Sequence, residues 1–430
     1  MKFVADLHLH SKFSRATSKD MTFDTLAYWA KIKGIKVLGT GDFTHPEWLF
    51  LAKQKLVPNG QGLFYLEKII PPDDPFLKSF KISPDDVLFM LTTEISFIYS
   101  KKGRVRKIHL LILAPDFETA EALNNSLSGI GNLHSDGRPI LGLDAKEFLK
   151  KVIRYAPQAV VIPAHIWTPW FSLFGANSGF NSIEECFEEL TPHIFALETG
   201  LSSDPPMNWR LSALDKYTLV SNSDAHSPSR IGREANVFNT TLSYKGIIKA
   251  LKQPLPDRFL YTIEFFPEEG KYHYDGHRHC QVIFSPEETK QHRYLCPRCG
   301  KKLTIGVLHR VEELADRKPD ENPPPKVPFL HLIPLNEIIG QALGKSAESR
   351  SVWEVYFRLI HELGNEHRIL TEVPLDQVSH FAPPLVSRGI ERMRQGEVTI
   401  VPGHDGVYGK INLFAEENNQ PEEPSQLKLF

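Results

Sequence analysis

The sequence has 430 residues, 41% hydrophobic and 24% charged, with a formal net charge of -2. This length predicts two or three domains, and the composition excludes a wholly disordered chain. The small net charge excludes nucleic-acid binding through a global basic field, and no apolar run reaches the roughly 18 residues of a membrane helix, so we expect a soluble, cytoplasmic protein.

Short apolar or β-branched runs alternate with amphipathic stretches over the first 240 residues. This alternation is typical of a parallel sheet or a barrel, with the chemistry at the carboxyl ends of the strands. Strands are predicted over 3–7, 37–40, 87–92, 108–114, 159–163, 194–199 and 218–221, and helices over 22–33 and 145–155.

Imidazole and carboxylate side chains follow these predicted strands or lie in them. A His-x-His pair on a strand sends both rings to one face, so His8 and His10 can chelate one ion. Taken singly, Glu94 is more typical of a helix cap or an ion pair, and His109 of a core histidine. The repeated placement predicts a barrel rim that holds several divalent ions, with the candidate ligands His8, His10, Asp42, Glu94, His109, His165, Asp224 and His226.

A second group of metal-capable residues lies after residue 261. His277-x-x-Cys280 and Cys296-x-x-Cys299 form two chelating pairs separated by 15 residues, which predicts a closed, structural zinc site. His279 is a poorer alternative to His277 because it is adjacent to Cys280. The fourth cysteine, Cys186, lies in a predicted helix and is expected to be buried in the protein core.

The remaining chain predicts a helical domain and a tail. Apolar positions recur at helical spacing over 335–397. We expect a catalytic barrel at 1–260, a zinc-binding domain at 261–318, a mainly helical domain at 319–412 and a flexible tail at 413–430. The tail ends in a pentapeptide that looks like the bacterial sliding-clamp motif, with Gln426, Leu427, Leu429 and Phe430 as the expected clamp-binding residues.

The order of the barrel motifs resembles the PHP (polymerase and histidinol phosphatase) superfamily of metal-dependent phosphoesterases. The resemblance implies an α/β fold, a distorted (β/α)7 TIM-like barrel. It also implies one ion on His8, His10, Glu94 and Asp224, a second on Glu94, His109 and His165, and a third on His226 and Asp42. Phe43 and Ser14 stand where relatives carry ligands, which weakens the third ion. Glu198 is expected behind the ligands or as a further ligand.

A narrower resemblance covers nearly the whole chain. The stretches 41–46, 164–171, 271–278, 307–317 and 402–409 are similar to the endonuclease Q family. That resemblance implies a hydrolase, a nucleoid-associated DNA-repair endonuclease that cuts 5′ to deaminated bases (uracil, hypoxanthine, xanthine) and abasic sites, leaving 3′-hydroxyl and 5′-phosphate ends.

The expected site uses the barrel ions, Zn, Mg or Mn, because paired ions suit in-line phosphoryl displacement. Glu94, Asp224 and His226 are the expected catalytic residues. Trp167, Trp170 and Phe171 form an expected wall for an extruded base. Two alternatives stay open: a PHP phosphoesterase acting on a small phosphate metabolite or nucleotide ends, and a barrel that only scaffolds a DNA-binding module.

Overall fold

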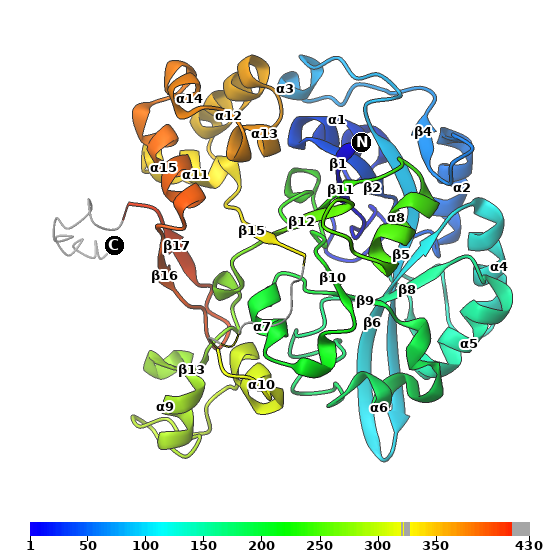
Figure 1. Cartoon of the computed structure of the whole chain (residues 1–430), viewed down its shortest axis with the longest axis vertical. Helices are drawn as coiled ribbons and strands as arrows, with labels where there is room; N and C mark the ends of the chain where they lie inside the picture. Colours follow the sequence, from blue (N-terminus) through cyan, green and yellow to red (C-terminus); the bar gives the residue numbers. More distant parts are fainter. Residues whose placement is uncertain (320, 322–326, 415–430) are drawn as a thin grey trace, which may run out of the picture.

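The computed structural model describes residues 1–319, 321 and 327–414. It has a mixed α/β fold around one large sheet, with a helical C-terminal group (Figure 1). The strands of the large sheet are β1 (Lys2–Asp6), β2 (Ile35–Gly39), β3 (Leu56–Pro58), β4 (Phe64–Leu66), β5 (Leu88–Lys101), β6 (Arg104–Ala114), β7 (Ile140–Leu141), β8 (Val160–Pro163), β11 (Ala235–Asn239), β12 (Phe259–Glu264) and β15 (Phe329–His331).

Helices surround this sheet in the first 260 residues. They are α1 (Phe23–Lys33), α2 (Pro46–Lys55), α3 (Pro75–Lys78), α4 (Phe117–Leu127), α5 (Ala145–Tyr155), α6 (Ile183–Phe187), α7 (Pro205–Trp209) and α8 (Tyr244–Lys252). The predicted helices 22–33 and 145–155 are confirmed. Thr22 caps α1 by accepting from Thr25 N, and Gly34 ends it at φ 89°, where glycine avoids the steric cost of other residues. Cys186 is buried in α6, as expected.

The large sheet is mixed, which corrects the expectation of parallel βα units throughout. β1 pairs in parallel with β2 and β2 with β5, but β5 and β6 form a long antiparallel hairpin. A two-residue turn at Lys102 and Gly103, both at positive φ, joins the two strands without a crossover helix. Glu94 therefore lies inside β5 and not at the end of a strand.

The edge of the sheet near His8 is closed by loops. β9 (Ala196–Glu198) and β10 (Thr218–Val220) form a separate parallel pair. Ile166 N donates to Glu198 O, and His10 N donates to Ala225 O, so loops after β8, β9, β10 and β1 meet. A closed seven-stranded barrel stays a prediction, because among the described strands the ladders break between β8 and β9 and between β10 and β1.

Two further parts follow the large sheet (Figure 1). The first contains β13 (Asp275–His277), β14 (Val282–Phe284), α9 (Pro286–Gln291) and α10 (Val307–Leu314). The second confirms the predicted helices, with α11 (Leu335–Leu343), α12 (Arg350–Leu363), α13 (Glu366–Thr371), α14 (Leu375–Phe381) and α15 (Pro384–Gln395), and ends in the hairpin β16 (Thr399–Val401) and β17 (Lys410–Asn412). The expected domain boundaries stay predictions.

A buried ion pair joins the C-terminal helices to α1. Lys33 Nζ lies 2.5 Å from Glu366 Oε2, and both side chains are 6% exposed. Tyr356 and the Leu335 amide also donate to Glu366. In the part of the chain that the structure describes, no helix is both long and apolar enough to cross a bilayer. The expected clamp-binding residues Gln426, Leu427, Leu429 and Phe430 lie outside the described residues.

Candidate metal centre

Six of the eight expected barrel residues form two adjoining groups. The first group contains His8, His10, Glu94 and Asp224, and the second contains Glu94, His109 and His165. Within each group the candidate ligand atoms all lie within 4.8 Å of one another. Residues that are up to 216 positions apart in the chain thus converge at the loop edge of the sheet.

The first group surrounds a point between two imidazoles and two carboxylates. His10 Nε2 lies 3.1 Å from Asp224 Oδ1 and 3.3 Å from Glu94 Oε2. His8 Nε2 lies 3.6 Å from the same Glu94 oxygen and 3.8 Å from Asp224 Oδ1. Two nitrogen and two oxygen donors at such separations are a donor set that divalent transition metals accept.

Unpaired polar atoms in this group support that fit. His8 Nε2, His10 Nε2 and Asp224 Oδ1 are buried atoms without a hydrogen-bond partner. Buried polar atoms are normally paired, because leaving one unpaired costs about 1 to 3 kcal/mol. A shared cation would satisfy all three atoms at once.

Glu94 faces both groups with different oxygens. Its Oε2 atom faces His8 and His10, whereas its Oε1 atom lies 2.7 Å from His109 Nδ1 and 2.9 Å from His165 Nε2. Burial alone would raise the pKa of Glu94, but the neighbouring His109 ring and the Arg138 guanidinium lower it well below its ordinary value. An ionised, fully buried carboxylate in this position can bridge two cations.

His109 is suited to the second group as a neutral imidazole. Burial lowers the pKa of His109 to about 4, in spite of the opposing effect of Glu94. Its Nε2 atom lies 3.1 Å from Ser96 Oγ, which leaves Nδ1 to face Glu94 and His165. An ordinary core histidine would not be expected to lie beside both Glu94 and His165.

Asp42 lies behind the first group and outside both. Its Oδ1 atom is 3.1 Å from His10 Nδ1, and its Oδ2 atom accepts from Ser11 N, Ser11 Oγ and Ser14 Oγ. Both carboxylate oxygens therefore have hydrogen-bond partners, and Asp42 belongs to neither group, so its place at a third ion stays a prediction. Ser14 thus helps to hold the Asp42 carboxylate in place. A Cβ at Gly137 would lie 2.2 Å from Asp42 Oδ2, so only glycine fits there.

His226 also lies outside both groups. Its Nδ1 atom donates to Asp224 O at 2.8 Å, and its ring contacts the His10 ring in a tilted arrangement at a centroid distance of 4.5 Å. The ring is 33% exposed, so it stands at the mouth of the centre. The expected third ion on His226 and Asp42 is therefore not supported by their positions.

Glu198 lies behind His8 and supports this candidate ligand, which is one of the two roles expected for it. Its carboxylate is 2.9 Å from His8 Nδ1 and accepts from His165 N at 2.9 Å and from Asn222 Nδ2 at 2.8 Å. These contacts hold His8 with Nε2 toward the centre, and carboxylates in this position orient metal-binding imidazoles.

Backbone strain marks the same residues. Asp42, His165 and Asp224 have φ values of 50°, 28° and 47°, a region that L residues other than asparagine and aspartate rarely occupy. A Cβ at Gly200 would meet His165 Cβ at 2.4 Å, so glycine is required for His165 to reach Glu94. Such strain is typical of functional sites.

Arg138 is part of the centre and was missing from the candidates. Its Nη1 atom lies 3.0 Å from Glu94 Oε2. Burial lowers the pKa of Arg138, but Glu94 and Asp224 more than offset this and raise it, so the guanidinium stays charged. It comes from the loop before the two-residue strand β7, and nothing in its sequence context signals a site.

The three expected substrate-binding aromatics separate in the structure. Trp167 is fully buried, donates to Asn208 Oδ1 and packs on Phe174. It belongs to the core and offers no face to a base, which corrects the expectation that it lines the substrate site. Phe171 lies beside the centre, with its ring 4.9 Å from the ring of His109. Trp170 is 43% exposed.

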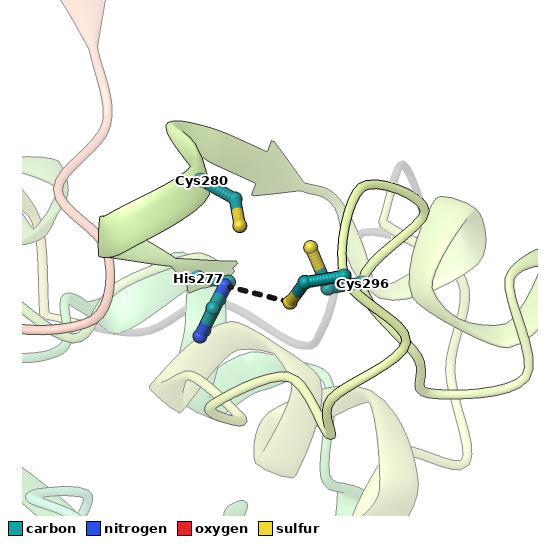
Figure 2. A group of neighbouring side chains, drawn as sticks. His277, Cys280 and Cys296 are labelled. Atoms are coloured by element: carbon teal, nitrogen blue, oxygen red, sulfur yellow. Dashed lines mark hydrogen bonds between the residues drawn. The ribbon is translucent and has the colours of Figure 1, made fainter.

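The expected zinc ligands converge in the second part of the chain. The candidate ligand atoms of His277, Cys280, Cys296 and Cys299 lie within 4.8 Å of one another. Figure 2 shows His277, Cys280 and Cys296 pointing to one space. Cys299 Sγ is 3.6 Å from His277 Nδ1. Burial raises the pKa of Cys296, but the backbone amides of Arg298 and Cys299 more than offset this and lower it to about 7. The group fits one closed tetrahedral zinc ion.

Comparison with known proteins places the chain in a family. It is 31% identical to the lesion-specific endonuclease PfuEndoQ of Pyrococcus furiosus, over 96% of this chain and 95% of that one, with a TM-score of 0.83. It is also 31% identical to an endonuclease Q solved with a 27-mer duplex that carries an abasic lesion at the active site, over 99% and 100% of the two chains, with a TM-score of 0.82.

The chain belongs to the endonuclease Q family. Residues 334–397 also match the family model of the MJ0043 C-terminal domain. An uncharacterised protein of Methanocaldococcus jannaschii, MJ0043, is 35% identical over 57% of this chain. The match covers 31% of that longer protein. The endonuclease Q structures thus cover the large sheet, the cysteine-containing part and the C-terminal helices together.

Proposed function

We propose that this chain is a metal-dependent DNA-repair endonuclease that hydrolyses the phosphodiester 5′ to deaminated bases and abasic sites, leaving 3′-hydroxyl and 5′-phosphate ends. The single observation that carries the chemistry is Glu94, one ionised carboxylate that faces two imidazole groups with separate oxygens. The full-length similarity to an endonuclease Q bound to lesion-bearing duplex supports the substrate class. A phosphatase for small metabolites would need neither the cysteine-containing part nor the C-terminal helices.

The residues divide the work as follows. His8, His10, Glu94 and Asp224 would hold one divalent ion, and Glu94, His109 and His165 a second, with Zn, Mg or Mn as the candidates. Two such ions supply Lewis acidity for in-line displacement at phosphorus. Arg138 brings a fixed positive charge to the same space and would orient a non-bridging phosphate oxygen.

His226 would handle a proton at the mouth of the centre. Because its Nδ1 donates to Asp224 O, its Nε2 atom is free to face substrate. Burial lowers the pKa of His226, so the ring is neutral near pH 7. It would take a proton at Nε2 from the attacking water and then give a proton to the departing 3′-oxygen.

The remaining parts have supporting roles in this proposal. The residues His277, Cys280, Cys296 and Cys299 would bind one structural zinc that folds the 261–318 region. Gln426, Leu427, Leu429 and Phe430 would dock on a bacterial sliding clamp, and the protein would act at the nucleoid.

A nicking assay tests the function. The protein, with magnesium or manganese, should nick an end-labelled duplex once, 5′ to a single uracil, hypoxanthine or abasic site, and leave the undamaged duplex intact. Glu94→Gln should abolish nicking and leave duplex binding within about twofold, whereas the exposed control Glu67→Gln should behave as wild type. Turnover of a phosphate monoester without any nick would select the small-substrate alternative, and lost DNA binding in Glu94→Gln would favour the scaffold reading.

A further inference from the structure

A line of aromatic rings leads away from the metal centre across two parts of the chain. Phe171 stands beside His109, and its neighbour Trp170 is 43% exposed. The Trp170 ring meets Tyr272 edge to face at a centroid distance of 5.4 Å. Lys271 Nζ lies 5.9 Å from the Tyr272 ring and 5.6 Å from the ring of Tyr408, which is 70% exposed. We call Trp170, Tyr272, Tyr408 and Lys271 the aromatic ledge.

The loop that carries Trp170 is held rigidly. Phe171 adopts φ 60°, and its ring lies against His109, whereas the Trp170 side chain is exposed. Thr168 Oγ1 donates to Trp170 O at 2.9 Å, and Asn177 N donates to Pro169 O at 3.1 Å. These hydrogen bonds within the loop fix the backbone around the exposed Trp170.

The turn that carries Tyr408 is fixed against the segment that carries Tyr272. Gly406 N donates to Lys271 O, and Gly403 N donates to Glu268 O, each at 2.8 Å. A Cβ at Gly409 would lie 2.1 Å from Glu268 O, so the two segments pack backbone to backbone. The ledge is assembled from residues more than 230 positions apart, and backbone hydrogen bonds fix the loop of Trp170 and the turn that carries Tyr408.

Exposed, preorganised aromatic rings beside a cation suit unstacked nucleic-acid bases. Stacking of one base on such a ring is sequence-tolerant and contributes about 1 to 3 kcal/mol, and an adjacent lysine neutralises a backbone phosphate. The ledge begins next to the group that would act on the phosphodiester. We propose that the aromatic ledge stacks the nucleotides that flank the lesion and so holds the damaged strand open at the metal centre. This inference rests on the proposed nuclease function and names the residues that recognise the distorted strand.

Two leucine variants from different parts of the chain test the ledge. Trp170→Leu and Tyr408→Leu each remove one ring from an exposed position, so folding is retained. Tyr155→Leu is a matched control, because Tyr155 is also exposed and also has a lysine and an arginine over its ring, but lies on α5. Each variant is titrated against a duplex with one uracil and a neighbouring 2-aminopurine, with the single-turnover nicking rate and the 2-aminopurine fluorescence as readouts.

The ledge predicts that half-saturation of nicking rises about tenfold in Trp170→Leu, with the maximal rate within about twofold of wild type. The fluorescence rise on binding, which reports unstacking, should shrink in both ledge variants and stay unchanged in Tyr155→Leu. Competition by undamaged duplex should be unaffected.

Wild-type half-saturation and fluorescence in both ledge variants would overturn the inference, as would an equal loss of affinity for undamaged duplex. If the wild-type protein failed to nick at all, the proposed function would fall, while the fluorescence titration would still decide whether the ledge receives unstacked bases.

Discussion

Asp42 stands directly behind His10, with its Oδ1 atom 3.1 Å from His10 Nδ1 and its Oδ2 atom taken by donors from Ser11 and Ser14. Burial lowers the pKa of His10, but Asp42 and Asp224 more than offset it and raise the pKa well above its ordinary value. The contact keeps the proton on Nδ1 and turns Nε2 toward Glu94 and Asp224.

Asp42→Asn should therefore weaken metal binding without removing a ligand. An amide can present its NH₂ group to His10 Nδ1, which favours the opposite tautomer, and loss of such a supporting carboxylate typically costs about 10- to 100-fold in metal affinity. Calorimetric titration with Mn²⁺ measures the affinity. Asp73→Asn, at a fully exposed carboxylate, is the control. Wild-type affinity in Asp42→Asn would show that His10 is oriented by something else.

Arg138→Gln should lower kcat more than it raises KM. The guanidinium lies 3.0 Å from Glu94 and keeps its charge, so its loss removes a donor for developing charge on the phosphoryl group. Removal of one such group costs about 100-fold in kcat. Steady-state nicking of a uracil duplex measures both constants. The kcat of Arg138→Lys should lie between those of wild type and Arg138→Gln, and the exposed control Arg154→Gln should match wild type. An effect confined to KM would mean that Arg138 only binds DNA.

Cys296→Ser should remove one zinc per chain and unfold the part that it organises. The four candidate ligands lie within 4.8 Å of one another, and structural zinc contributes on the order of 10 kcal/mol to the folding of such small units. Elemental analysis counts the zinc, and limited proteolysis within 261–318 detects the loss of structure. Cys186→Ala should keep the zinc, since Cys186 lies elsewhere in the core. Full zinc content in Cys296→Ser would contradict the assignment.

Glu264→Gln should change the pH dependence of stability. Burial raises the pKa of Glu264 from 4.5 to about 8 in the folded protein. The folded state thus binds a proton that the unfolded state releases between these values, so the stabilisation is complete below pH 4.5 and is lost as pH rises toward 8.

The glutamine variant mimics the protonated form, so its Tm should fall less between pH 5 and 8 than the wild-type Tm. Thermal melts at several pH values measure this, and the exposed Glu397→Gln should follow the wild-type curve. Parallel curves for Glu264→Gln and wild type would show that the carboxyl is ionised throughout.

The positions of the strands and of the ligands were predictable because both follow from local patterns. All seven predicted strands form, six of them within a few residues and β5 with an end nine residues later than predicted. The predicted helices 22–33 and 145–155 begin and end where capping residues stand. The sequence predicts Glu94 as a ligand at the end of a strand, whereas β5 continues past it to Lys101. The sequence around Lys102 and Gly103 did not indicate that the strand would continue into a hairpin.

The residues that sequence reasoning missed or misplaced depend on contacts between distant segments. The position of Asp42 after a strand says nothing about the serine hydroxyls that donate to its carboxylate. Arg138 comes from a loop with no motif, and only folding brings it to Glu94. Trp167 differs from Trp170 by three positions, yet one is buried and the other exposed, because the loop reverses between them.

The buried contact between Lys33 and Glu366 ties the end of the first helix to the last third of the chain. Removal of either side chain would leave the other charge buried without its ionic partner, at a cost of about 3 to 5 kcal/mol. The pair therefore opposes separation of α13 from α1, and these two helices should melt together.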